Sequence, residues 1–372
     1  MLNSINTVSK ESLAKLTYIL FILIAIVTIL VYSEDYAIPF IVALIIWFII
    51  HELRENFQMI PWVRKNIPIW LQSMIAFFVI AIVIVSIINM VYYNVSILYE
   101  SLDHYLANFQ IVLLKLNKTF GMDVATRVND YWGQYDIAAL AGSAINYTTS
   151  LFGNGFLILI YVVFLLVEES IFPLKLKAFY PEGEDQEKKQ NLFYKMDQNI
   201  GRYLRLKSLV SFITGLLSYI ALVIIGVEAA LFWAFLIFLL NFIPTVGSLI
   251  ATLFPALFAV FQMAELAPFV YIIISVGTVQ IIVGNIIEPK LMGNSLNMSS
   301  IVVLLSLTIW GAMWGVMGMV LSVPITVLMM IVFEEIPSLR FIAVALSEKG
   351  QLSDPISRPR SKKLEEENKK SL

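Results

Sequence analysis

The sequence has no cysteine, few charges and only two histidines, His51 and His104. Without cysteine the chain can form no disulfide, thiol nucleophile or thiolate metal site. Charged residues make up 14% of the chain, against roughly 25% in a soluble domain. The net charge of −2 argues against nucleic acid as a partner. We therefore expect no metal site and no cofactor.

Hydrophobic residues make up 59% of the chain and lie in long runs. A membrane span needs about 20 such residues, so the sequence predicts an all-α polytopic membrane protein with about eight membrane segments. The first run is followed by Ser33-Glu34-Asp35 rather than by a small-residue cleavage site, so we interpret it as a retained span. The predicted segments are residues 16–32, 36–50, 68–92, 151–167, 208–226, 229–262, 266–284 and 301–333.

Two of these segments, 229–262 and 301–333, are too long for one straight crossing and too short for two. Each is interrupted by turn-forming residues, the first at 241–247 and the second at 310–318. Such breaks survive at membrane depth only when protein buries them or when they line a watery cavity. We predict two broken or re-entrant helical hairpins, a feature that marks the binding region in transporters.

The positions of lysine and arginine predict the topology, because these residues favour the cytoplasmic side. With a cytoplasmic N-terminus, 22 of the 25 basic residues are cytoplasmic, three are external and none lies within a span. We expect a protein of the inner cell membrane with both termini in the cytoplasm. The units 208–262 and 266–333 would then enter the membrane from opposite sides, a pattern that favours an inverted repeat.

Composition divides the chain into five regions. In the second region, apolar residues at three- and four-residue steps predict an amphipathic helix before Gly121 and another through Trp132. These helices either pack at the outer interface or between subunits, or form a lid. A separate cytoplasmic helix is expected from about Gln186 to Lys207. The regions are the N-terminal spans 1–92, the external insert 93–150, the fourth span and basic helix 151–207, the transport core 208–333 and the largely disordered cytoplasmic tail 334–372.

The first hairpin tip carries polar groups that could contact a solute. Asn241, Thr245 and Ser248 supply polar side chains, while Pro244 and Gly247 free backbone carbonyls. Carbonyls and amides at a broken helix can hold a cation or a small polar molecule. The alternative is that Asn241 only satisfies the broken backbone.

The second tip carries aromatic and small residues instead. Trp310 and Trp314 either stack on a ring-shaped substrate or anchor the chain at the membrane interface. Gly311 and Gly315 have the spacing that permits close helix packing, and we favour packing as their role.

The end of the segment 266–284 contributes a carboxylate. Gln280 lies two four-residue steps before Glu288, so both share a helix face, and Asn285 lies beside Glu288. A partly buried Glu288 could exchange a proton during transport. The alternative is a structural salt bridge between Glu288 and either Lys290 or an arginine within 202–205.

Residues 179–333 resemble the autoinducer-2 exporter family of permeases. The resemblance rests on short motifs whose order and spacing match the family. They are Phe179-Tyr180-Pro181, Gly201-Arg202-Tyr203-Leu204-Arg205, Gly226-Val227, residues 241–247, Pro255, residues 285–293, residues 299–306, Trp310-Gly311, Trp314-Gly315, Gly318-Met319 and Val323-Pro324. The resemblance implies about eight membrane segments and a homo-oligomer. It also implies export of the furanone signal autoinducer-2 or, as in other members, sodium/proton antiport.

Three functional classes remain to be weighed. A secondary transporter of a small polar solute, working by alternating access in the lipid bilayer, accounts for both hairpin breaks. An intramembrane protease is not expected, because the predicted spans hold neither histidine nor lysine. An ATP-driven pump is not expected either, because the sequence contains no phosphate-binding Gly-Lys-Ser/Thr loop. A non-transporting scaffold or regulatory protein explains the external insert but not the polar breaks.

Overall fold

The computed structural model describes residues 10–120, 155–169, 171–172, 174–175, 178, 184–292, 297–348 and 350. In these ranges the chain is helical apart from turns and one isolated bridge between Met298 and Ser347, which confirms the all-α prediction. The second helix predicted in the insert, through Trp132, lies outside the described residues. The predicted disordered tail, apart from its first residues, also lies outside them.

Six described helices are long and apolar enough to cross a membrane, which confirms a polytopic membrane protein. Two shorter apolar helices, Leu20–Tyr32 and Ala230–Leu240, accompany them. The six are Glu34–Gln58, Ile69–Glu100, Gly201–Ile225, Val246–Met263, Ala267–Met292 and Ser300–Glu335.

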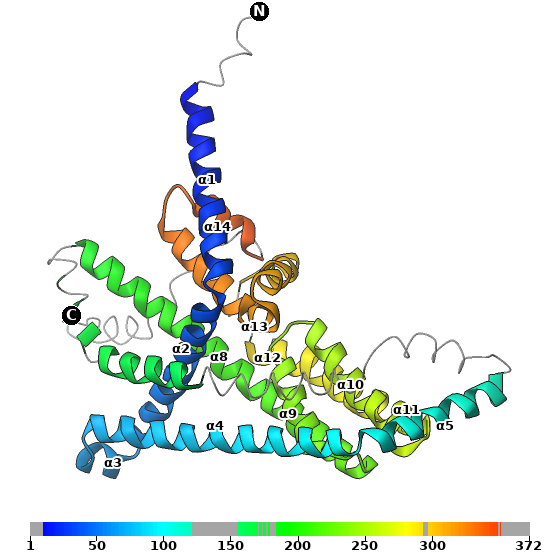
Figure 1. Ribbon diagram of the computed structural model, residues 1–372. Helices are drawn as coiled ribbons and strands as arrows, with labels where there is room; N and C mark the ends of the chain where they lie inside the picture. Colours follow the sequence, from blue (N-terminus) through cyan, green and yellow to red (C-terminus); the bar gives the residue numbers. More distant parts are fainter. Residues whose placement is uncertain are drawn as a thin grey trace, which may run out of the picture.

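The N-terminal part contains α1 (Lys10–Tyr32), α2 (Glu34–Gln58), α3 (Pro61–Asn66) and α4 (Ile69–Glu100). In Figure 1, α1 rises away from the other helices and α4 runs along one edge, where α5 (Leu102–Phe120) continues it. The helices α2 and α4 pack together with the helix at 155–169 through a small apolar cluster. The buried members of this cluster are Ala43, Ile50, Ala76 and Val162.

The helix α8 (Glu184–Ile225) is continuous over 42 residues. The prediction that a cytoplasmic helix ends near Lys207 and that a separate span follows is therefore wrong. The physical reason is that no proline interrupts this stretch, and the well-separated Gly201 and Gly215 are tolerated inside a helix. At Gly201, α8 passes close to α2. A Cβ atom at this position would lie 3.0 Å from the Phe48 ring of α2.

Both predicted helix breaks are present. The first hairpin consists of α9 (Ala230–Leu240) and α10 (Val246–Met263), joined by a five-residue turn. The second is α13 (Ser300–Glu335), in which Trp314 and Gly315 leave the helical conformation. We call these pieces hairpin one and hairpin two.

Helix α8 is the element that both hairpins share. It packs against α9, α11 (Ala267–Ile282) and α13, while α11 also packs against α10. A π-turn at Val283–Ile287 connects α11 to α12 (Glu288–Met292), and α14 (Arg340–Leu346) packs on α13. One apolar cluster joins α8 to hairpin one and α11, and another joins α8 to hairpin two.

Candidate functional site

The tip of hairpin one contains a strained turn. Thr245 has φ 61° and ψ −58°, and the amide of Val246 donates to the carbonyl of Pro244 over 2.6 Å. This geometry is that of the γ-turn with positive φ, which is rare and strained, above all for a β-branched residue. Such strain persists only where the surrounding structure enforces it, and it clusters at functional sites.

Gly247 allows the two arms of hairpin one to meet directly after this turn. A Cβ atom at residue 247 would lie 1.8 Å from the carbonyl oxygen of Leu240 and 3.0 Å from Cβ of Ile243. Only glycine fits such an approach of backbone to backbone. Gly247 therefore shapes the tip and offers no side chain to a solute.

The polar side chains of this tip have different environments. Asn241 is buried, and its Nδ2 donates to Oγ of Ser211 in α8 over 3.0 Å. Ser248 is half-buried and its hydroxyl donates to the carbonyl of Thr245, whereas the Thr245 side chain is exposed. Asn241 thus attaches the tip to α8, while Thr245 is the polar side chain left accessible.

Hairpin two turns with a similar close approach of its arms. Gly315 has φ 59° and ψ −140°, a conformation that is open essentially to glycine alone. A Cβ at Gly318 would lie 1.8 Å from the carbonyl oxygen of Trp310. This is the same distance as that between a Cβ at Gly247 and the carbonyl oxygen of Leu240. A Cβ at Gly311 would approach Cγ of Met319 to 2.9 Å. These glycines permit packing between the two arms of the hairpin.

The two tryptophans of hairpin two are engaged with protein. Their ring centroids are 5.2 Å apart, and Trp314 is only 4% exposed. The Trp314 indole donates to the carbonyl of Leu30, in the last turn of α1, over 2.9 Å. Trp314 is therefore a packing residue that anchors hairpin two to α1, while Trp310 remains half-buried beside it.

Glu288 forms an ion pair with a residue that the sequence analysis did not consider. Lys207 of α8 donates to Oε1 of Glu288 over 2.5 Å, and the side chains are 6% and 23% exposed. The predicted partners, Lys290 and the arginines within 202–205, are wrong, because α8 continues as one helix and its buried face presents Lys207. The statement that no lysine lies within a span is also wrong, since Lys207 is buried in an apolar helix.

Lys207 belongs to a polar stripe along α8. Its members recur at steps of four, three and four residues, so they share one helix face. Asn241 of hairpin one donates to Ser211 of the stripe. Oγ of Ser218, in the stripe, and Nε2 of Gln280, in α11, are buried without a hydrogen-bond partner. The members are Lys207, Ser211, Thr214 and Ser218, all at most 4% exposed. Their helical spacing was visible in the sequence, although the predicted topology placed Lys207 in the cytoplasm.

The π-turn shapes the approach of α11 to this stripe. The amide of Glu288 donates to the carbonyl of Val283, five residues earlier, and Pro289 follows without an amide donor of its own. A π-turn winds more slowly than an α-helix, which offsets the drift that four-residue steps accumulate. Gln280 and Glu288 therefore stay on nearly the same face of the helix, whereas Asn285 is exposed.

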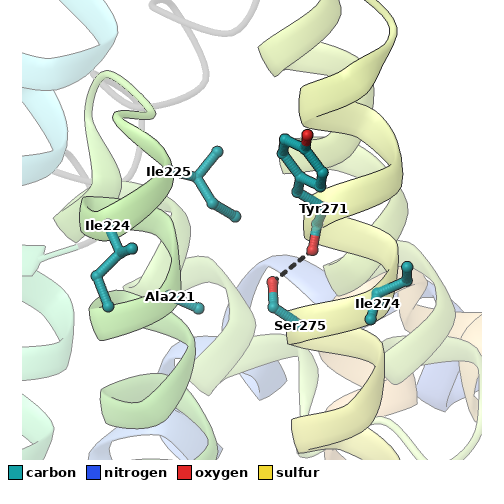
Figure 2. Close-up of a pocket in the computed structure, with 6 residues that line it drawn as sticks. All are labelled: Ala221, Ile224, Ile225, Tyr271, Ile274 and Ser275. Atoms are coloured by element: carbon teal, nitrogen blue, oxygen red, sulfur yellow. Dashed lines mark hydrogen bonds between the residues drawn. The ribbon is translucent and has the colours of Figure 1, made fainter.

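A cavity of about 300 Å³ lies between α8 and α11, where Ala221 and Ile225 continue the helix face of the polar stripe beyond Ser218. Figure 2 shows Ala221 and Ile225 of α8 opposite Tyr271 and Ser275 of α11, with the Ser275 hydroxyl donating to the Tyr271 carbonyl. None of the predicted site residues lines it, and its walls are apolar. The lining residues are Ala221, Ile224, Ile225, Tyr271, Ile274 and Ser275.

Helix α5 is fixed to the base of hairpin one. Tyr105 donates to Oε2 of Glu228 over 2.5 Å, and Asn108 donates to the carbonyl of Gln262 over 2.9 Å. Burial and the Glu228 carboxylate raise the pKa of Tyr105 to about 12, so its hydroxyl remains a donor. The Gln262 side chain bonds to the amide of Glu228 and to the carbonyl of Gly226. These bonds favour a packing role for α5 over a lid.

Comparison with known proteins extends the resemblance beyond 179–333. The sequence profile described as AI-2E family transporter matches residues 20–338. A protein of Borreliella burgdorferi is 30% identical over 296 residues, 78% of this chain and 80% of that protein. The AI-2 transport protein TqsA of Escherichia coli is 29% identical over 342 residues, 90% of this chain and 96% of TqsA. YhhT of Escherichia coli is 39% identical over 176 residues, 46% and 48% of the two chains.

Proposed function

Because the chain belongs to the AI-2E transporter family, we propose that it is a secondary transporter of a small polar solute that works by alternating access. The observation that carries this proposal is the strained turn at Thr245 beside the buried polar stripe of α8. A helix break next to buried hydroxyl, amide and charged groups is what a solute needs inside a membrane. The name of TqsA makes autoinducer-2 the first solute to test.

The proposed path runs along α8. Hairpin one reaches Ser211 of α8, and hairpin two reaches Leu30 near the end of α1. With both termini in the cytoplasm of an inner-membrane protein, hairpin one enters from outside and hairpin two from inside. The tips are attached to different helices, so each can move without the other. Movement of one tip at a time would open the path to one side of the membrane.

Site roles follow from this arrangement. Thr245 and Ser248 present hydroxyls to the solute. Pro244 and Gly247 shape the turn, and the expectation that they free backbone carbonyls fails for Leu240, Ile243 and Pro244, whose carbonyls accept from backbone amides. Gln280 offers an unpartnered amide to the same path. Asn241, Gly311, Trp314 and Gly315 position the hairpins, while Trp310 and Asn285 lie at the edge of the path.

A second candidate function is sodium/proton antiport, which the Lys207–Glu288 pair favours. The pair holds two opposite charges in a largely buried position, so loss of either charge would leave the other uncompensated. A cation that competes with Lys207 for the Glu288 carboxylate would couple its own movement to the breaking of the pair. The same pair could couple export of a polar solute to the proton gradient.

Homo-oligomer formation is part of the proposal. Helix α4 exposes large apolar side chains along most of its length, and only 6% of its most apolar window is buried within the chain. Lipid or a second copy of the chain would cover this surface.

Flux into proteoliposomes tests the transport function. We expect uptake of one member of a panel of small polar solutes that includes the autoinducer-2 furanone, under imposed proton or sodium gradients. Glu288→Gln should abolish the pH dependence of that flux at equal protein abundance, because the proton-exchanging group is lost. Lys290→Gln, two residues away and exposed, is the matched control. Absence of flux for every solute and ion would favour the scaffold interpretation, and unchanged pH dependence would remove Glu288 from coupling.

A further inference from the structure

The connector between α2 and α4 must lie at a membrane boundary. It has only ten residues, 59–68, and it joins two helices that are each long and apolar enough to span a bilayer. Whichever way the chain is oriented, so short a connector stays near the lipid headgroups. It contains the short helix α3 and continues into the first turn of α4. We call residues 59–70 the corner.

The corner combines cations with exposed aromatic rings. Arg64 and Lys65 are both exposed, and the chain has no acidic residue between Glu55 and Glu100. Trp62 is 66% exposed and Trp70 is 64% exposed. Tryptophan at headgroup depth places its ring among the glycerol groups and its indole N–H toward water. Met59, Ile60 and Ile69 are further large apolar residues of the corner that are exposed.

Three other connectors have the opposite charge. Ser33 connects α1 to α2, whose first turn contains Glu34 and Asp35. Glu228 lies between α8 and α9, and Glu265 lies between α10 and α11. None of these three connectors contains lysine or arginine. The corner is therefore a local concentration of positive charge, unlike these three connectors.

The corner is held in place by hydrogen bonds. Nε2 of Gln72, which is 2% exposed, donates to the carbonyl of Ile67 over 2.7 Å. Arg54 of α2 donates to Oγ of Ser73 over 3.1 Å and so joins the helices on both sides of the connector. A surface that is already ordered loses little conformational entropy when it binds a ligand.

We propose that the corner is a binding surface for anionic phospholipid headgroups. Arg64 and Lys65 pair with the headgroup phosphate, and Trp62 and Trp70 pack at the glycerol level of the same lipid. This surface is independent of the solute path and of the direction of transport. It requires only that the connector lie at the membrane boundary.

Titration of the purified full chain with lipid tests this proposal. Phosphatidylglycerol and phosphatidylcholine of equal chain length are added to protein in neutral detergent, and bound lipid is counted by native mass spectrometry. We expect phosphatidylglycerol to bind more tightly. Arg64→Gln with Lys65→Gln should weaken its binding by roughly 25-fold, at about fivefold for each cation near a charged surface. Phosphatidylcholine binding should not change.

Two further variants make the result specific. The charge-preserving exchange Arg64→Lys with Lys65→Arg should retain the preference for phosphatidylglycerol, which separates lost charge from lost folding. Lys115→Gln with Lys118→Gln removes the same charge from α5 and should leave the preference unchanged. Equal binding of the two lipids to the wild-type chain would overturn the proposal. So would a loss of preference in the α5 variant as large as that in the corner variant.

Discussion

The ion pair between Lys207 and Glu288 sets the strongest constraint on single residues. Its distance of 2.5 Å joins α8 to α12, and Lys207 is almost fully buried. Glu288→Gln or Lys207→Gln leaves one charge without its partner, which costs on the order of 3–5 kcal/mol for a buried pair. The double variant removes both charges and should lose less stability than the sum of the single variants. Thermal unfolding of the four proteins in one detergent measures this; additive losses would show that the pair is not coupled.

Close backbone approach gives a second prediction at the residue scale. Gly247→Ala places a Cβ 1.8 Å from the Leu240 carbonyl, so the arms of hairpin one must separate. We expect the free energy of unfolding to fall by about 1–3 kcal/mol or more, the cost typical of an overpacked core. Gly277→Ala is the matched control, because no atom lies within 4 Å of its added Cβ and alanine favours a helix. Unfolding temperatures compare them, and equal values would contradict the close approach.

The sequence predicted the residue types of the site but not their partners. Asn241 and Glu288 were recognised because polar groups beside apolar spans are rare. Their partners Ser211 and Lys207 are 30 and 81 residues distant in the chain, and no local pattern connects them. Trp314 was open to two interpretations, since its bond to Leu30 depends on where α1 lies.

At the scale of the elements, helix α5 holds the base of hairpin one in place through hydrogen bonds to Glu228 and Gln262. Tyr105→Phe removes the hydrogen bond to Glu228 without changing the aromatic contact with Phe258. Because Glu228 is exposed, we expect a loss of about 1 kcal/mol of local stability. Hydrogen exchange at the amides of 226–230 should accelerate accordingly. Tyr99→Phe, an exposed tyrosine just before α5, serves as the control. Unchanged exchange in Tyr105→Phe would show that α5 does not hold this end.

Helix breaks were the elements that the sequence predicted best. Pro244 and Gly247 in one segment, and Gly315 in the other, interrupt apolar runs where the structure has its turns. The end of a helix was harder to predict in α8, because charged residues at 202–207 suggested a boundary that helix geometry does not require. The π-turn at 283–287 was invisible in sequence, since its residues are ordinary helix formers apart from Gly284.

At the scale of the whole molecule, the chain consists of an N-terminal set of helices and two hairpins that share α8. Hydropathy alone was sufficient for the class of the molecule, an all-α polytopic membrane protein, while six of the described helices are long enough to cross a membrane. The arrangement of the hairpins was not predictable, because it depends on contacts such as Asn241–Ser211 and Trp314–Leu30. The proposed inverted repeat agrees with the matching close approaches at Gly247 and Gly318.

The central claim is that the tip of hairpin one lines a water-accessible path through the membrane. Labelling of Thr245→Cys by a membrane-impermeant maleimide, applied from each side of oriented vesicles, tests it most directly, since the chain has no native cysteine. Leu249→Cys, in the first turn of α10 and 68% exposed, is the control for a lipid-facing position. We predict that Thr245→Cys reacts from at least one side, that a transported solute protects it, and that Leu249→Cys stays unreactive. A Thr245→Cys protein that resists the reagent from both sides would contradict the account.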